Sequence, residues 1–299
     1  MMARTAEENA LSEIRYSRGL SPWQVVARGL AVIVTVAAFV LTGEAVAWGG
    51  PLTPLALLGT LVLLLVNLLG YLELVARGRR RGSAYSQVYE AEGKSLAFLT
   101  GWTLILSGMG LCAMLARGFG VQVAVLLRTQ LNLDLPVWPL ASGLILLLAA
   151  NNTVGTREGR RGPVTASLLM IALLIGVCFL ALPKIDLTNY RGGPRAWDRA
   201  ISIVLSAYVG LEITATLQNE MRDGSGRTLR TLLLTPVLST AIVAVVVGVG
   251  IGVVGPGALS GSWSPIGLLG SSVAGGAGRP LMLAVGALSI ALALNSAFV

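Results

Sequence analysis

The sequence contains no histidine, and this absence removes several classes of catalytic site at once. There can be no histidine-based nucleophile triad, no HExxH zinc site and no histidine proton relay. The sequence also lacks a Gly-x-Ser-x-Gly motif and a pair of intramembrane aspartates, so a membrane-embedded enzyme is the least favoured function. We therefore predict no catalytic residue, no metal site and no cofactor.

Charged residues are scarce. They form 12% of the 299 residues, whereas an ordinary soluble domain has about 25%, and the mean hydropathy is +0.78. Apolar runs such as Leu55–Tyr71, Val164–Leu182 and Leu232–Val254 are long enough to cross a hydrocarbon core of about 30 Å at about 1.5 Å per residue. The runs are continuous rather than alternating, which favours helices over a barrel. The sequence therefore predicts an all-α polytopic membrane protein.

Cysteine is rare as well, with only Cys112 and Cys178 present. Both lie inside apolar runs, so we interpret them as small core residues rather than as a disulfide. The first 21 residues are polar and charged and do not match a cleavable signal peptide.

The apolar residues gather in eight segments, each of which we predict to be a transmembrane helix. Their approximate bounds are 25–48, 53–76, 95–125, 137–150, 164–182, 200–217, 231–254 and 280–299.

The basic residues predict the orientation of these helices. If the N-terminus is cytoplasmic, 15 of the 22 lysines and arginines fall on the cytoplasmic side, as positively charged loops usually do. The net charge of +8 is then a topology signal in short loops and does not indicate a nucleic-acid partner. We predict a multi-pass protein of the cell (inner or plasma) membrane, with the lipid bilayer as its surroundings.

The sixth segment ends in the stretch AYVGLEITATLQNEMRDG, Ala207–Gly224, which does not suit a plain anchor. A carboxylate at mid-membrane costs about 2.5–3.5 kcal/mol on insertion scales, and glycine costs about 0.8–1.0 kcal/mol relative to alanine in a helix. We predict an unwound segment at Tyr208–Leu211 whose free backbone groups bind a ligand. The predicted substrate-binding residues here are Ala207, Tyr208, Val209, Gly210 and Glu212. Alternatively, Glu212 pairs with an arginine such as Arg222 or lies in a water-filled vestibule.

Two further segments carry polar interruptions. The first contains Thr35 and then Gly43 and Glu44, which are also compatible with a helix end and an interfacial glutamate. The eighth contains Asn295 and Ser296, which we assign with Glu212 to coupling or gating, although interhelical hydrogen bonds would explain them equally.

The first and sixth segments are five segments apart, the spacing of a five-plus-five inverted repeat. We predict one transmembrane domain over residues 1–299, with a first repeat at 25–183 and a second at 200–299. Five plus five requires ten spans and eight are found, so we expect the second repeat to be incomplete in this chain, which stops inside an apolar run. Either the protein is truncated or the real chain continues.

The cytoplasmic stretch RRRGSAYSQVYEAE, Arg79–Glu92, combines a charge run with two tyrosines. We interpret the arginines as a solvated topology signal and the piece Gly82–Tyr85 as the start of a short interfacial helix.

Several stretches together resemble the amino acid–polyamine–organocation permease family. AYVGLE resembles the family's broken sixth helix, and FVLTGEAVAWGGP resembles its exit from the first helix. The tail NEMRDGSGRTLRTLL is similar to a cytoplasmic motif of the family without its two prolines. The exit from the second segment is similar at Tyr71, Glu73, Gly82, Ala84, Tyr85, Tyr89, Glu90, Gly93, Phe98, Gly101 and Trp102.

This resemblance implies a LeuT-like fold and transport of a small-molecule substrate, an amino acid or related organic amine. It implies coupling to H⁺ more often than to Na⁺, and alternating access around the broken first and sixth helices. The family's first helix breaks at a glycine-rich stretch that aligns with Val36, Ala37 and Ala38, which are therefore predicted to bind substrate. Alanine there removes the close approach that glycine allows, which favours a polyamine or a carboxylate-poor substrate over an α-amino acid. The alternative is a non-transporting homologue that acts as a sensor or membrane scaffold.

Overall fold

The structure is a computed structural model that describes residues 21–77, 84–153, 162–212, 214 and 225–298. Within these ranges the chain is helical except for short connections such as residues 132–136 and 191–196, and it forms no β-strand. The prediction of an all-helical chain with several long apolar helices is confirmed, and this composition is that of a polytopic membrane protein.

The elements follow the predicted segments in order. They are α2 (Pro22–Thr35), η1 (Val36–Leu41), α3 (Thr42–Gly49), η2 (Gly50–Leu52), α4 (Thr53–Arg77), α5 (Ala84–Glu92), α6 (Lys94–Leu131), α7 (Val137–Thr153), α8 (Gly162–Ala181), η3 (Leu182–Lys184), η4 (Leu187–Tyr190), α9 (Trp197–Ala207), η5 (Tyr208–Gly210), α11 (Ser225–Val254), α12 (Pro256–Ser260), α13 (Pro265–Ala274), η7 (Gly275–Ala277) and α14 (Gly278–Phe298).

Helix α2 begins with a complete capping box. The Ser21 hydroxyl accepts a hydrogen bond from the Gln24 amide, and the Gln24 side chain accepts one from the Ser21 amide. Pro22 occupies the first helical turn, where its missing N–H group has no helical partner to lose. These local interactions determine where helix α2 begins.

In the part of the chain that the structure describes, four helical stretches are long and apolar enough to cross a membrane: Pro22–Gly70, Lys94–Leu131, Arg230–Val254 and Pro265–Ala297. The first of them holds two predicted segments joined by a tight turn. Val137–Thr153 and Leu168–Lys184 are shorter apolar helices. The count of eight spans and the five-plus-five repeat remain predictions.

Helix α6 is longer than the predicted third segment, which ends near Val125. It continues to Leu131 and includes Arg117 and Arg128, and it ends where Asn132 adopts a left-handed conformation with φ 57°. The apolar run stops at the charges, but arginine is a good helix former, so hydropathy underestimates the length of the helix.

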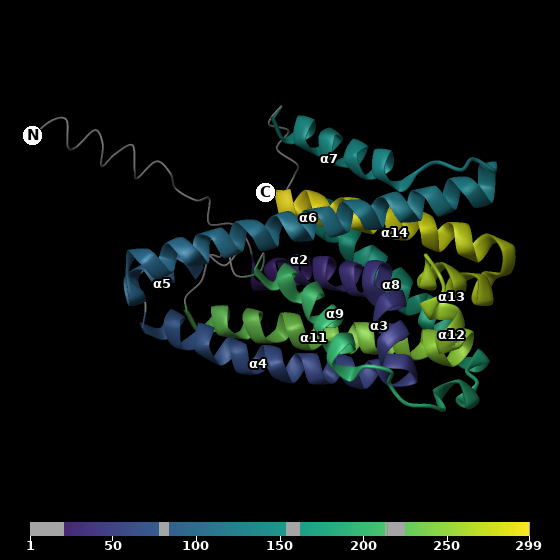
Figure 1. The fold of residues 1–299 in the computed structure, drawn as a ribbon, viewed down its shortest axis with the longest axis horizontal. Helices are drawn as coiled ribbons and strands as arrows, with labels where there is room; N and C mark the ends of the chain where they lie inside the picture. Colours follow the sequence, from purple (N-terminus) through teal and green to yellow (C-terminus); the bar gives the residue numbers. More distant parts are fainter. Residues whose placement is uncertain (1–20, 78–83, 154–161, 213, 215–224, 299) are drawn as a thin grey trace, which may run out of the picture.

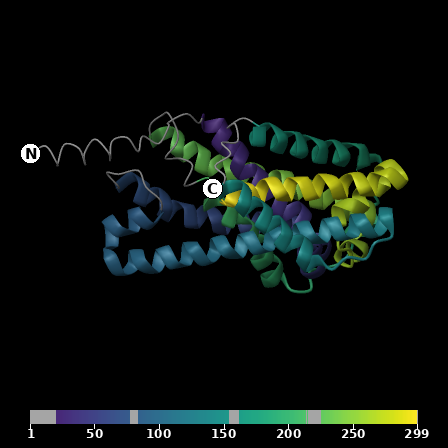
Figure 2. The same cartoon turned by 90° about the horizontal axis from the view of Figure 1, so that it is seen from above.

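The long helices run side by side along the long axis of the molecule (Figures 1 and 2). Helix α5 lies at one end, next to the end of α4 and the beginning of α6. The hairpin formed by α12 and α13 lies at the opposite end, where α11 ends and α14 begins. This short hairpin was not among the predicted segments.

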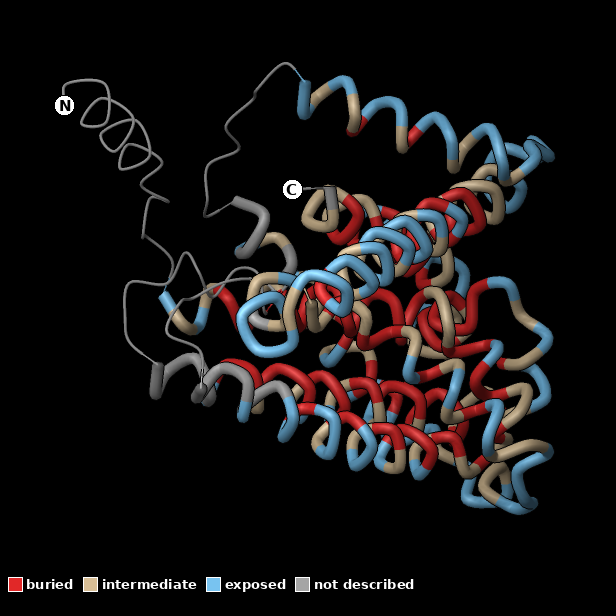
Figure 3. The backbone as a smooth tube through the Cα atoms, turned by 60° about the vertical axis from the view of Figure 1, so that its left-hand side comes forward, coloured by how far each residue is buried: buried red, intermediate tan, exposed pale blue. Residues whose placement is uncertain are grey.

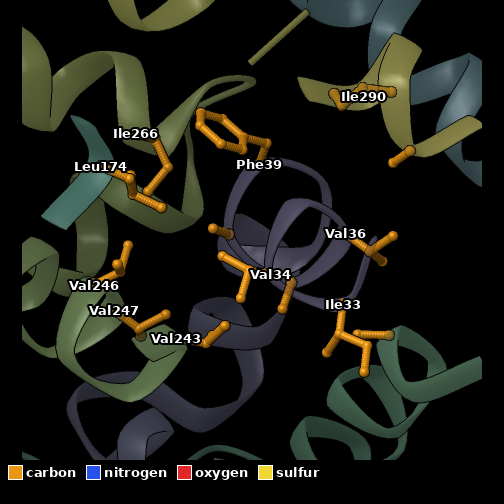
Figure 4. Packing of buried hydrophobic residues seen from close by; sticks show 14 of the residues in the cluster. Ile33, Val34, Val36, Phe39, Leu174, Val243, Val246, Val247, Ile266 and Ile290 are labelled. Carbon is orange, nitrogen blue, oxygen red and sulfur yellow. The ribbon is translucent and has the colours of Figure 1, made fainter. Parts of the chain in front are cut away.

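The first segment forms the centre of the hydrophobic core. Helix α2 packs against α11, α14 and α8, and every described residue from Gly29 to Phe39 is buried. Figure 3 shows this burial on the inner faces of the bundle, while α7 is largely exposed. In Figure 4, Val34 lies near Val243 and Val247 of α11, and Phe39 lies on the side of Ile266 from α13. Any interruption of this central helix is therefore enclosed by the other elements.

Helices α13 and α14 meet through two glycines. A Cβ atom added to Gly278 would overlap the carbonyl oxygen of Gly270, whereas one added to Gly276 would meet nothing within 4 Å. The hairpin is thus held against α14 by a backbone approach that only glycine allows.

We expect Gly278→Ala to lower the stability of the purified protein, because the new methyl group overlaps backbone that cannot rotate away. Overpacking of this kind costs about 1–3 kcal/mol. Thermal unfolding in detergent measures the effect, with Gly276→Ala as the matched control. Equal melting temperatures for the two variants would contradict the close approach.

Candidate functional site

The first helix is interrupted at its buried centre. Residues Val36–Leu41 form a π-helical segment, which we call the first break, between the α-helices α2 and α3. Insertions of this kind are frequent at functional sites. Val36, Ala37 and Ala38 lie in the first break and are at most 6% exposed. The structure thus places the predicted substrate-binding residues of the first helix at the interruption, while their role in binding stays a prediction.

Two side chains bind carbonyl groups of the first break. The Thr42 hydroxyl donates a hydrogen bond of 2.8 Å to the Ala37 carbonyl, and the Gln122 amide donates one of 3.3 Å to the Phe39 carbonyl. A buried carbonyl without a donor costs about 1–3 kcal/mol. These contacts therefore give two carbonyl groups of the π-helical segment a side-chain donor.

The sixth segment is interrupted as well. Helix α9 ends at Ala207, and Tyr208–Gly210 form a 3₁₀ turn, which we call the second break. The amide of Leu211 donates to the carbonyls of Tyr208 and Val209, and helical geometry resumes at Leu211 and Glu212. The expectation of an unwound segment at Tyr208–Leu211 is wrong in this detail, because the turn is tightened and keeps its local hydrogen bonds. The rest of the predicted segment, apart from residue 214, lies outside the described residues.

The two breaks lie in neighbouring parts of the core. A Cβ atom added to Gly210 would lie 2.8 Å from Val32 Cγ1 and 3.3 Å from Ile33 Cγ1 of α2. The second break packs against α2, and the first break packs against α9. Because Gly210 has no side chain, the sixth segment can approach the first helix at Val32 and Ile33, about one turn before the first break.

Tyr208 does not direct its hydroxyl into open space. Its side chain is 4% exposed, and its hydroxyl is hydrogen-bonded to the hydroxyl of Thr240 on α11. Thr240 in turn lies within 2.7 Å of the Pro236 carbonyl. Tyr208 thus ties the second break to α11 in this conformation.

Gln122 was not singled out from the sequence, although its side chain makes two hydrogen bonds at the site. It is 1% exposed, and besides donating to Phe39 it accepts a 3.0 Å hydrogen bond from the hydroxyl of Ser264, the residue before α13. It thus links α6, the first break and the hairpin. A lone amide within the apolar run of residues 95–125 is the signal that could have identified it.

A small cavity lies beside the first break. It has a volume of about 10 Å³ and is lined by Val34, Thr35, Phe39, Met170, Ile171, Leu174 and Ser289. A cavity of this size has room for about one water molecule. The hydroxyl of Ser289 is buried and makes no hydrogen bond within the described part of the chain. This cavity is therefore too small for a ligand of amino acid size.

The predicted coupling residues occupy different places. Glu212 is half-buried and follows the second break by two residues. Asn295 lies at the far end of α14, where its side-chain oxygen is 3.5 Å from the amide nitrogen of Asn152 on α7, and Ser296 donates to the Leu292 carbonyl of its own helix. Asn295 is six residues beyond Ser289, about 9 Å along the helix. The structure therefore places Glu212, rather than Asn295 or Ser296, next to a break.

Known proteins that are similar to this chain in sequence include amino acid permeases and transporters. A family model described as amino acid permease matches residues 20–299. The chain is 22% identical to cationic amino acid transporter 1 of Arabidopsis thaliana over 75% of this chain and 41% of that protein. It is 22% identical to the branched-chain amino acid permease BcaP of Bacillus subtilis (83% and 57%) and 27% identical to cationic amino acid transporter 4 of Mus musculus (72% and 38%). The chain spans about half the length of the curated relatives it matches.

The hydrogen bonds of Gln122 allow a test of whether this side chain stabilises the first break. We expect Gln122→Leu to destabilise the protein by about 1–3 kcal/mol, because it leaves the buried Phe39 carbonyl without its donor. Gln130→Leu is the matched control, since Gln130 is exposed on the same helix. Thermal unfolding of both purified variants measures the difference. A loss no larger for Gln122→Leu than for Gln130→Leu would show that the first break does not depend on this contact.

Proposed function

The chain belongs to the amino acid permease family of the amino acid–polyamine–organocation superfamily, and on that premise we propose that it is a secondary transporter of amino acids or related organic amines. The observation that carries the proposal is the pair of helix interruptions, the first break in the first helix and the second break in the sixth segment, in one buried core. Backbone that leaves α-helical geometry at membrane depth is tolerated where it is buried in protein or lines a cavity, and transporters use such segments as binding sites.

The substrate would bind between the two breaks. Helix N-termini favour a carboxylate and free carbonyl groups favour a cationic amine, so the two breaks offer complementary groups to a zwitterion or an organic amine. Glu212 would contact the amine or carry a coupling proton. In this proposal Val36, Ala37, Ala38, Ala207, Val209 and Gly210 form the walls of the site, and Tyr208 leaves Thr240 when the site opens.

We propose H⁺ as the coupling ion, with Na⁺ as the alternative, and a cell membrane with the N-terminus on the cytoplasmic side. The three relatives named above are two transporters and a permease, which supports transport rather than catalysis. Two of them are named for cationic amino acids and one for branched-chain amino acids. A cationic amino acid would fit the two names of the first kind and the acidic Glu212.

One observation favours the alternative of a non-transporting homologue that acts as a sensor or scaffold. The carbonyls of Ala37 and Phe39 in the first break already accept hydrogen bonds from Thr42 and Gln122. Fewer backbone groups therefore remain for a ligand than an open break would offer. Vesicles distinguish the two functions, because a scaffold accumulates no solute under any ion gradient.

The test is uptake of radiolabelled arginine, leucine and putrescine into vesicles that contain the purified protein. We expect at least one of them to accumulate when a proton or sodium gradient is imposed and to leak out when the gradient is collapsed. If vesicles with the protein accumulate no more than empty vesicles for all three compounds and both ions, the transporter proposal is wrong.

Glu212→Gln tests the coupling role in the same vesicles. We expect the variant to lose the dependence of uptake on external pH, because an amide cannot take up a proton. Glu44→Gln is the matched control, since Glu44 is exposed and bonded to the Trp48 indole near the other end of the first helix. A pH profile of Glu212→Gln identical to that of Glu44→Gln would remove Glu212 from the coupling mechanism.

A further inference from the structure

The segment between the second and third predicted helices has no part in the proposed transport site. Many of its residues, however, are among those that resemble the permease family in sequence. Helix α5 and the beginning of α6 border an open surface pocket with a volume of about 650 Å³. It is lined by Tyr85, Tyr89, Lys94, Ser95, Phe98 and Leu99. A volume of this size is in the range of small-molecule binding sites, about 300–1,000 Å³.

The pocket is built by the local fold. Gly93 has φ 86°, a conformation that side chains rarely adopt, and it lets α5 turn back onto α6. A Cβ atom added to Gly101 would lie 3.1 Å from Tyr85 Cδ2, so the Tyr85 ring rests on the glycine surface of α6. The rings of Tyr85 and Tyr89 stack with centroids 6.3 Å apart. The aromatic wall of the pocket is therefore held in place from both helices.

One part of the pocket is polar and basic. Lys94 is the first residue of α6 and is exposed, and Ser95 lies beside it. Lys94 is the one charged residue among the described residues that line the pocket, and Glu90 and Glu92 of α5 are exposed and do not line it. The phenol groups of the two tyrosines add hydrogen-bond donors. This combination suits a singly charged anion that also has an apolar part.

The other part of the pocket opens onto an apolar stripe of α6. Phe98, Trp102, Leu106 and Met109 recur every three or four residues and are 51–65% exposed, and Leu99 is 59% exposed. Lys94 and Met109 are 15 positions apart, which corresponds to about 22 Å along the helix. One leaflet of a bilayer has a hydrocarbon thickness of about 15 Å, so an acyl chain that starts at the pocket would lie along the stripe for its full length.

We propose that this pocket binds an anionic phospholipid, with the phosphate at Lys94 and the tyrosine hydroxyls and an acyl chain along Phe98, Trp102, Leu106 and Met109. The charge at one end and the apolar stripe at the other identify an amphiphile, and aromatic residues are typical of the membrane interface where such a headgroup lies. The site is separate from the two breaks and does not depend on the transport proposal.

Native mass spectrometry of the detergent-purified protein tests the site, with phosphatidylglycerol and phosphatidylcholine of equal chain length as the probes. We expect tighter binding of phosphatidylglycerol, and we expect Lys94→Gln to weaken it about fivefold, as the loss of one basic residue near an anionic surface should, while phosphatidylcholine binding stays unchanged. Arg230→Gln is the matched control, because Arg230 is an exposed basic residue on α11 at the same end of the bundle.

A second variant tests the aromatic wall without changing the charge. Gly101→Val keeps Lys94 but displaces the Tyr85 ring, so we expect weaker binding of both lipids. Equal affinity of the wild-type protein for the two lipids would overturn the proposal. So would an equal loss in Lys94→Gln and Arg230→Gln, which would indicate unspecific attraction to a basic surface, and so would unchanged binding in Gly101→Val.

Discussion

A carbonyl group that leaves the α-helical ladder inside a membrane finds no water to replace its lost donor, and the centre of this molecule is arranged around that constraint. The first helix changes to π-helical geometry at Val36–Leu41 within the most buried part of the core, where Thr42 and Gln122 bind the Ala37 and Phe39 carbonyls. Because Gln122 also accepts from Ser264, the same amide joins the first break to the hairpin of α12 and α13. The geometry of the interruption thus depends on contacts from two other elements.

In the second break the backbone groups find hydrogen-bond partners in a different way. Its 3₁₀ turn keeps local hydrogen bonds, and Gly210 supplies the space that brings it against Val32. Tyr208 is held by Thr240 on α11, so the second break is fixed from two sides. If a ligand binds at the two breaks, as we propose, its own groups must replace these internal hydrogen bonds.

Much of the fold could be predicted from the sequence, because the length of an apolar run determines whether it can span a bilayer. In their described residues, all eight predicted segments coincide with a helix or an interrupted helix, and an interruption of the sixth segment was anticipated from Gly210 and Glu212. The first break was anticipated only through the family resemblance, since Val36–Phe39 contain no glycine. The hairpin at 256–274 was missed because its two helices are short and rich in glycine and serine. Gln122 was missed because nothing in one sequence tells which helix a lone amide will face.

We propose that a ligand binds between the first and second breaks, and thermal unfolding with added ligand is the measurement that tests this proposal. The purified protein would be melted alone and with arginine, leucine or putrescine, next to Gly210→Ala and the control Gly108→Ala, whose added methyl group would meet nothing within 4 Å. We expect at least one compound to raise the melting temperature of the wild-type and Gly108→Ala proteins but not that of Gly210→Ala. An equal rise in Gly210→Ala, or no rise in the wild-type protein with any of the three compounds, would contradict it.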